Sequence, residues 1–250
     1  EVGLYASIVP LVFYGLLGSS RALAVGPVAV VSLMTAAALS EIVEQGTMGY
    51  AVAALDWRGQ GGSQRLTANP RKGHIGSFKQ YDDDLHAFIT QAVLPDCPPP
   101  YFGLGHSMGG NILLNAAINR NWFEKVVLTS PLINLAEVSV PRGFIKFAAT
   151  FAKATGLGRK QLPTPSGAGF PSWDFPDNPF TGDITRFERT KQVMEETPEI
   201  AVGGATFSWL YAALQAIDEL AAVKKGTILR TPVLIVAAGR DRIVSTQACR

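Results

Sequence analysis

The chain has 250 residues, a formal net charge of +2 and a mean hydropathy of +0.18, so it can form one large domain or one domain with an appendage. The small charge and the lack of a Lys/Arg-rich run argue against a nucleic-acid partner. Two cysteines, Cys97 and Cys249, provide neither a disulfide framework nor metal-ligand spacing. We therefore expect no metal, no cofactor and no nucleic acid, and the reduced thiols of a cytosolic protein.

Two uncharged apolar segments open the chain. Each has 19 residues, one between Glu1 and Arg21 and the other between Arg21 and Glu41. A helix of that length roughly spans a hydrocarbon core of about 30 Å. The positive start and the cleavage site of a secretory signal are not evident. We therefore expect two membrane segments and a natural start upstream of Glu1, with buried helices of a soluble core as the alternative.

Pro27 divides the second apolar segment. A helix that begins there has about 14 residues before Glu41, or roughly 21 Å, which is too short to cross a membrane alone. Such a half-helix directs its N-terminus at an anion near the middle of the membrane. The string GLYASIVPLVFYGLLGSSRALAVGPVAVVSLMTAAAL resembles the second and third membrane segments of the SulP sulfate permeases. The resemblance covers about the first 50 residues and implies an anion site at the backbone amides that follow Gly26 and Pro27.

From about Gly49 onward, short apolar strands alternate with helical stretches, which is typical of an α/β sheet. The predicted strands are YAVAALDW (50–57), YFGLGHS (101–107), KVVLTSP (125–131) and TPVLIVAAGRD (231–241). The predicted helices are FKQYDDDLHAFITQAV (78–93) and MGGNILLNAAINR (108–120). A partly helical insertion rich in Pro and Gly, at about 132–230, precedes the last strand. We predict a membrane fragment over 1–48 and, over 49–250, a mostly parallel sheet with a helical cap.

Ser107 lies between a predicted strand and a predicted helix, in the motif Gly105-His106-Ser107-Met108-Gly109. A turn from strand to helix that exposes a serine above the sheet edge is so tight that small residues must flank it. The backbone amide of Met108, at the helix N-terminus, then faces the oxyanion that develops during attack on an ester. This context favours a catalytic nucleophile over an ordinary turn serine.

Asp241 follows the last predicted strand, in the string AAGRDRIV. This is the place of the triad acid in a fold whose chain order is Ser, Asp, His; an N-cap or a surface carboxylate is the alternative. The loop DWRGQGGS (56–63) matches the pattern D-x-R-G-x-G-x-S of many α/β-hydrolases. With NPFTGDITRFERTKQVMEETPEIAVGGATFSWLYAAL (178–214), it makes residues from about 50 to 250 resemble the lysophospholipase and monoacylglycerol lipase (serine aminopeptidase-like) group of α/β-hydrolases.

This resemblance implies a serine carboxyl-ester hydrolase whose substrate is a small ester or a lipid. It also implies a cap that covers the serine and receives an acyl chain. The apolar cap candidates are Phe144, Phe147, Phe151, Phe207, Trp209 and Leu210. Plain packing is the alternative role for these side chains.

The triad base is the missing part of this interpretation. In the family the histidine follows the acid after one more strand, so after Asp241 we expect it beyond Arg250. The chain's three histidines, His74, His86 and His106, all precede the predicted acid. The family also supplies an oxyanion amide from a loop upstream of YAVAALDW, where permease-like sequence stands here. We therefore expect the chain as written to be inactive.

The predicted join falls near GYAVAAL (49–55), a string that suits a membrane segment as well as a buried strand. We expect either a recombined reading frame or a membrane-tethered hydrolase. The second function class is a fragment of a sulfate or anion permease. As written, the chain is expected at a membrane through residues 1–48, with the hydrolase part in the cytoplasm.

Overall fold

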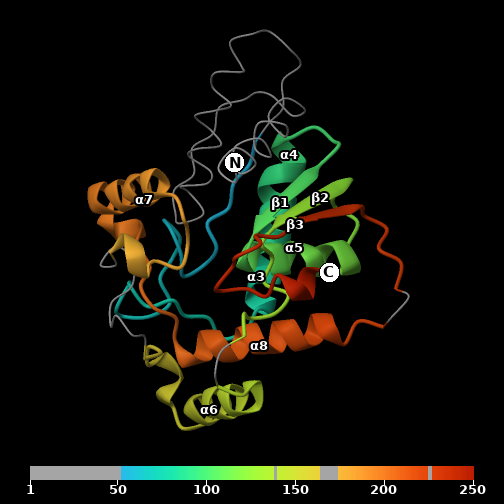
Figure 1. Cartoon of the computed structure of the whole chain (residues 1–250). Helices are drawn as coiled ribbons and strands as arrows, with labels where there is room; N and C mark the ends of the chain where they lie inside the picture. Colours follow the sequence, from blue (N-terminus) through green and yellow to red (C-terminus); the bar gives the residue numbers. More distant parts are fainter. Residues whose placement is uncertain (1–51, 138–139, 164–173, 225–226) are drawn as a thin grey trace.

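The computed structural model describes residues 52–137, 140–163, 174–224 and 227–250 (Figure 1). The expected membrane segments over 1–48 lie outside these ranges, and so does the expected anion site at Gly26 and Pro27. Among the helices within these ranges, none has the length and apolar character needed to cross a membrane. The ranges therefore cover the part of the chain in which the sequence predicts an α/β sheet.

Three parallel strands form the sheet of the described residues, in the order β1 (Phe102–His106), β2 (Lys125–Thr129) and β3 (Val233–Val236). In the register, Val127 lies between Leu104 and Leu234. The predicted strands at these positions, and their adjacent parallel arrangement, are confirmed. Because the strands are parallel, their carboxyl ends share one edge of the sheet.

The strand predicted over YAVAALDW is wrong, because residues 52–57 form no strand. The end of this segment belongs to a tight glycine loop instead. The carbonyl of Asp56 accepts a hydrogen bond from the Ser63 hydroxyl at 2.5 Å, and that of Trp57 accepts one from the Gln60 amide at 2.9 Å. These two carbonyls are therefore used within the loop rather than in a ladder with β1.

Both predicted helices are confirmed. α3 (Lys79–Phe88) continues through a π-helical turn, η1 (Ile89–Val93), into the short α4 (Leu94–Asp96), and α5 (Met108–Asn119) connects β1 to β2. Their buried side chains, with those of β2 and α8 (Phe207–Ala221), form the core on one face of the sheet; they include Tyr81, Leu85, Ile112, Leu128 and Ile217. On the other face, Leu104 and Leu234 are each 53% exposed.

The insertion between β2 and β3 is partly helical, as the sequence predicts. Besides α8 it contains α6 (Arg142–Ala154), η2 (Leu157–Arg159), η3 (Phe175–Asp177), α7 (Ile184–Glu196) and η4 (Pro198–Ile200), and η5 (Gln247–Cys249) follows β3. Thr206 caps α8 by accepting a hydrogen bond from the Trp209 amide at 3.3 Å. α6 packs on the side of α8 that faces away from the sheet (Figure 1), and Asp218 of α8 pairs with Arg142 and Lys146 at 2.6 Å each.

Candidate active site

Ser107 has a strained backbone at the turn from β1 to α5, with φ of 50° and ψ of −115°. A non-glycine residue in such a region costs about 1–3 kcal/mol and persists only when its surroundings impose it. The Ser107 amide donates to the Thr129 carbonyl at 3.0 Å, and the Ser107 carbonyl accepts from the amides of Leu132 at 2.9 Å and Asn111 at 3.2 Å. The neighbouring strand and the loop after it therefore hold this turn in the conformation that the nucleophile prediction requires.

The positions at this turn that sterically require glycine differ in part from the glycine positions of the G-x-S-x-G motif. A Cβ atom on Gly105 would lie 2.7 Å from the Gly109 carbonyl oxygen, so glycine is required there. A Cβ on Gly110 would lie 2.7 Å from Cβ of Pro131, whereas one on Gly109 would make an ordinary contact of 3.6 Å with Nε1 of Trp57. The close approach therefore involves Gly110, which the motif did not single out, although the pair of glycines was visible in the sequence.

Met108 begins α5 and is buried, with its amide at the first helical position, where an N–H has no partner within the helix. Its sulfur lies 3.4 Å from Nε2 of Gln60, in the loop 56–63. Burial raises the pKa of Tyr81 far above its ordinary value, although Trp209 and Gln60 hydrogen-bond to its hydroxyl. Polar contacts thus link helix α8 to the serine turn through Tyr81 and Gln60, neither of which the sequence analysis named.

The loop 56–63 is held in shape by its own side chains. The Asp56 carboxylate accepts a hydrogen bond from the Gly62 amide at 2.9 Å, and burial raises the pKa of Asp56. A Cβ on Gly61, where φ is +52°, would lie 2.3 Å from that carboxylate. Arg58 pairs with Asp84 of α3. The pattern D-x-R-G-x-G-x-S therefore has a structural reason, since the carboxylate and the arginine fasten a turn that only glycine can complete.

Asp241 follows β3 and is half-buried, at the same sheet edge as Ser107. Its Oδ1 accepts hydrogen bonds from the amides of Ile243 at 2.8 Å and Val244 at 2.9 Å. Among the described residues, no donor occupies its other oxygen, Oδ2. Burial lowers the pKa of His106, and a hydrogen bond to Thr129 and the negative charge of Asp241 oppose this in part. The carboxylate is therefore oriented by the backbone and lies near the end of β1.

Each of the three histidine rings contacts a side chain other than Ser107 and Asp241. Nδ1 of His74 is 3.0 Å from the hydroxyl of Thr206, and Nδ1 of His106 is 3.0 Å from that of Thr129. The ring of His86 stacks on Trp122 with 5.5 Å between centroids. In the described ranges, no three His, Cys, Asp or Glu side chains gather closely enough to hold a metal ion.

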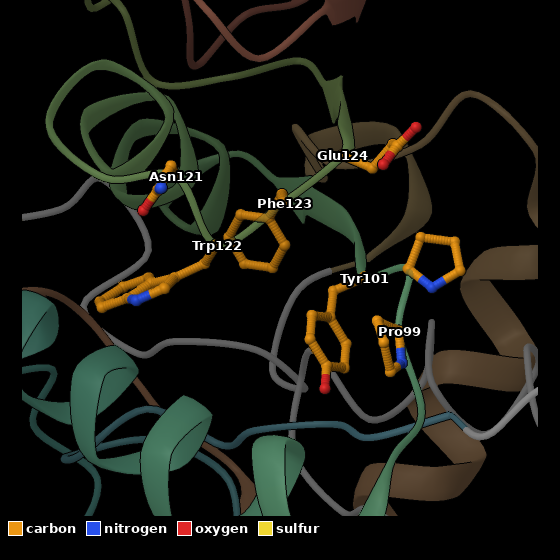
Figure 2. A pocket seen from close by; sticks show the side chains of 7 residues that line it. Pro99, Tyr101, Asn121, Trp122, Phe123 and Glu124 are labelled. Atoms are coloured by element: carbon orange, nitrogen blue, oxygen red, sulfur yellow. The ribbon is translucent and has the colours of Figure 1, made fainter.

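Two surface pockets lie away from the predicted catalytic residues. One, of about 440 Å³, is lined by Tyr101 and Pro99 on one side and by Trp122 and Phe123 on the other (Figure 2). These residues precede β1 and β2, so this pocket lies at the amino edge of the sheet. The second, of about 500 Å³, lies between residues 55–66 and α3. Neither is lined by Ser107 or Asp241, and open parallel sheets bind ligands at the carboxyl edge.

The parallel sheet, the strained serine turn at its carboxyl edge and the helical insertion before the last strand are those of an α/β-hydrolase fold. The chain belongs to the family described as "Serine aminopeptidase, S33", whose sequence pattern matches residues 38–250. It is 30% identical over 201 residues to Lysophospholipase L2 of Escherichia coli (strain K12), a match that covers 80% of this chain and 58% of that protein. The chain therefore spans less than two thirds of this relative.

One solved structure shares the fold of this chain, and a short sequence match points to a different family. The monoacylglycerol lipase of Paleococcus ferrophilus shares the fold, with a TM-score of 0.53, 20% identity, and coverage of 78% of this chain and 65% of that one. Probable sulfate transporter 4.2 of Arabidopsis thaliana is 62% identical over 42 residues, which is 17% of this chain and 6% of that protein. The family match begins at residue 38, inside the permease-like segment, so the domain boundary at 48/49 stays a prediction.

Proposed function

We propose that this domain is a serine carboxyl-ester hydrolase of the lysophospholipase and monoacylglycerol lipase type. Ser107 is the nucleophile, Asp241 is the triad acid, and the amide of Met108 is one donor of the oxyanion hole. The observation that carries the proposal is the strained backbone of Ser107 at the N-terminus of α5. The name of the relative Lysophospholipase L2 supports a lipid ester as the substrate.

In the proposed reaction, Oγ of Ser107 attacks the ester carbonyl carbon while a histidine takes the hydroxyl proton. The carbonyl oxygen becomes an oxyanion near the start of α5. The Met108 amide is available to it, whereas the Ser107 amide already donates to Thr129. The C–O bond then breaks, and the histidine returns the proton to the departing alcohol. Water next attacks the acyl carbon while the histidine takes one of its protons. The bond to Oγ breaks, and the proton passes to Ser107 as the acid leaves.

We propose that the base is a histidine outside residues 1–250, because the three histidines of this chain bind elsewhere. Asp241 supports this assignment, since an acid fixed through Oδ1 has Oδ2 free to hold an imidazole N–H. In a related triad, losing the histidine alone lowers turnover by about six orders of magnitude. Residues 1–250 alone are therefore expected to hydrolyse esters very slowly.

The test compares residues 1–250 with a chain extended by a histidine-bearing segment taken from a relative. The longer chain is expected to hydrolyse a p-nitrophenyl ester and to be labelled by a fluorophosphonate at Ser107. Ser107→Ala should abolish both, Asp241→Asn should lower turnover about 10⁴-fold, and the control Ser77→Ala should change neither. Ester turnover that survives Ser107→Ala would overturn the proposal, and fast Ser107-dependent turnover by residues 1–250 would overturn the external base.

For residues 1–48 we propose a permease-derived membrane segment, which the short match to a sulfate transporter supports. It is either a tether or the product of a recombined reading frame; transport by a permease fragment is the weaker candidate, because the match covers so little of a transporter. Sequencing single DNA molecules across codons 40–65 separates a genuine fusion from a misassembly. A fusion of residues 1–48 to a soluble reporter should stay with carbonate-washed membranes, and its appearance in the supernatant would exclude the membrane segment.

A further inference from the structure

Three segments that are distant in the sequence pair with one another at the start of α8 (Figure 1). Residues 203–207 lie in the middle and lead directly into this helix. On one side the Thr206 amide donates to the Gly73 carbonyl at 2.8 Å, and on the other the Phe207 amide donates to the Lys160 carbonyl at 3.1 Å. These bonds therefore attach α8, together with the segment that follows α6, to the loop that contains Gly73.

Thr206 connects this junction to the side chain of His74. Its hydroxyl oxygen accepts a hydrogen bond from the Trp209 amide at 3.3 Å and lies 3.0 Å from Nδ1 of His74. Because a backbone amide can only donate, the hydroxyl proton of Thr206 is left for His74, and Nδ1 is the unprotonated, accepting nitrogen. Thr206 is fully buried, so bulk water does not replace this acceptor. The closed junction therefore favours a neutral His74.

The charges around His74 favour the same protonation state. Lys72 lies in the same loop, and its Nζ donates to the Arg159 carbonyl of η2 at 3.3 Å. Burial lowers the pKa of His74, and the positive charges of Arg159 and Lys72 lower it further. Gly59 and Thr206, which face His74 from two other elements, are uncharged. Within the described ranges, a proton on this ring therefore meets two like charges and no paired carboxylate.

We propose that His74 and Thr206 form an acid-sensitive joint between the helical insertion and the sheet domain. When His74 takes up a proton from the solvent, Nδ1 can no longer accept, and the Thr206 hydroxyl proton loses its partner in a buried site. Lys72 and Arg159 also repel the imidazolium. Both effects favour an open joint, in which the start of α8 separates from the loop around Gly73 while the sheet stays folded.

The joint is independent of the proposed hydrolase reaction, because its residues are not those of the predicted site at Ser107 and Asp241. A connection made by a few hydrogen bonds can open at a lower free energy than the packed core, so local opening does not require global unfolding. Histidine is the side chain whose ordinary pKa lies closest to neutral pH. Mild acid is therefore the condition under which the attachment of α8 should weaken.

Hydrogen exchange, followed by mass spectrometry of the whole 250-residue chain in one detergent, tests the joint. The peptides of interest cover residues 203–210, and peptides from α5 are the internal reference. Measured rates at about pH 7.5 and about pH 5 are divided by the intrinsic rates, so that only structural opening is compared. We expect protection at 203–210 to fall roughly fivefold at the lower pH, the effect of one lost hydrogen bond, while α5 keeps its protection.

Two matched histidine substitutions separate the joint from general acid destabilisation. His74→Asn keeps an acceptor near the position of Nδ1 but does not titrate, so the fall in protection at 203–210 should disappear. The control His86→Asn removes a histidine whose ring stacks on Trp122, and it should leave the fall unchanged. A fall that persists in His74→Asn would overturn the proposal. An equal fall in α5, or no response to pH in the parent chain, would also overturn it.

A second variant keeps the test decisive if His74→Asn does not fold. Lys72→Gln with Arg159→Gln retains His74 and removes the two charges that repel its imidazolium. The fall in protection between the two pH values should therefore be smaller than in the parent chain. A fall as large as that of the parent would overturn the proposal.

Discussion

Gly109 and Gly110 give a prediction about stability, because they are adjacent glycines with different amounts of room for a Cβ atom. A Cβ at residue 110 would lie 2.7 Å from Cβ and 2.9 Å from Cα of Pro131, and these atoms belong to a proline ring and its backbone, which cannot move away easily. Overpacking of this kind typically costs about 1–3 kcal/mol. A Cβ at residue 109 would lie 3.6 Å from Nε1 of Trp57, which is an ordinary contact.

Both residues lie in the first turn of α5, where alanine gains up to about 1 kcal/mol over glycine. Gly109→Ala is therefore expected to leave the free energy of unfolding unchanged or slightly higher, whereas Gly110→Ala should lower it. The difference between the two variants should be about 1–3 kcal/mol, or several degrees in Tm for a domain of this size. Urea unfolding and thermal melting of the two variants, side by side with the parent chain, measure it. If Gly109→Ala destabilised the protein as much as Gly110→Ala, the steric argument at Pro131 would be refuted.

Three further predictions follow from buried or exposed groups. Tyr81→Phe should lower the free energy of unfolding by about 1–3 kcal/mol, because it removes the acceptor for Trp209 and Gln60; unchanged urea denaturation would contradict this. Burial lowers the pKa of His74 below its ordinary value of 6.5, and the positive charges of Arg159 and Lys72 lower it further. The neutral His74 ring therefore stabilises the fold above pH 6.5, and this stabilisation is lost as the pH falls through the folded-state pKa. The drop in Tm between about pH 7.5 and about pH 5 should thus be smaller in His74→Gln than in the parent, and an equal drop would argue against it. Finally, β1 has an unpaired edge among the described strands and an exposed Leu104, so Leu104→Lys should reduce concentration-dependent sedimentation; no change would show that this surface does not drive association.

The sequence predicted elements whose signal is local. Continuous apolar runs bounded by glycine and proline gave the three parallel strands, and the G-x-S-x-G motif between a strand and a helix gave the turn at Ser107. YAVAALDW carries the same local signal but forms no strand, because pairing depends on a partner that no local pattern contains. The catalytic roles of Ser107, Met108 and Asp241 stay predictions.

The other features that the sequence did not predict depend on contacts between residues that are distant in the chain. The periodicity of α6 predicts two faces but does not say that the small Ala149 faces the domain while Phe147 faces solvent. Gly110 is required by Pro131, which is distant in sequence. Gln60 and Tyr81 come together with Met108 only because the loop 56–63 and α3 pack beside the serine turn.

The backbone of Ser107 also bears on how this sequence would change over generations. With φ of 50°, the position suits glycine, which adopts such angles without a Cβ clash. Ser107→Gly should therefore stabilise the fold while it removes the proposed nucleophile. Under selection for folding alone, lineages would drift toward glycine at this site.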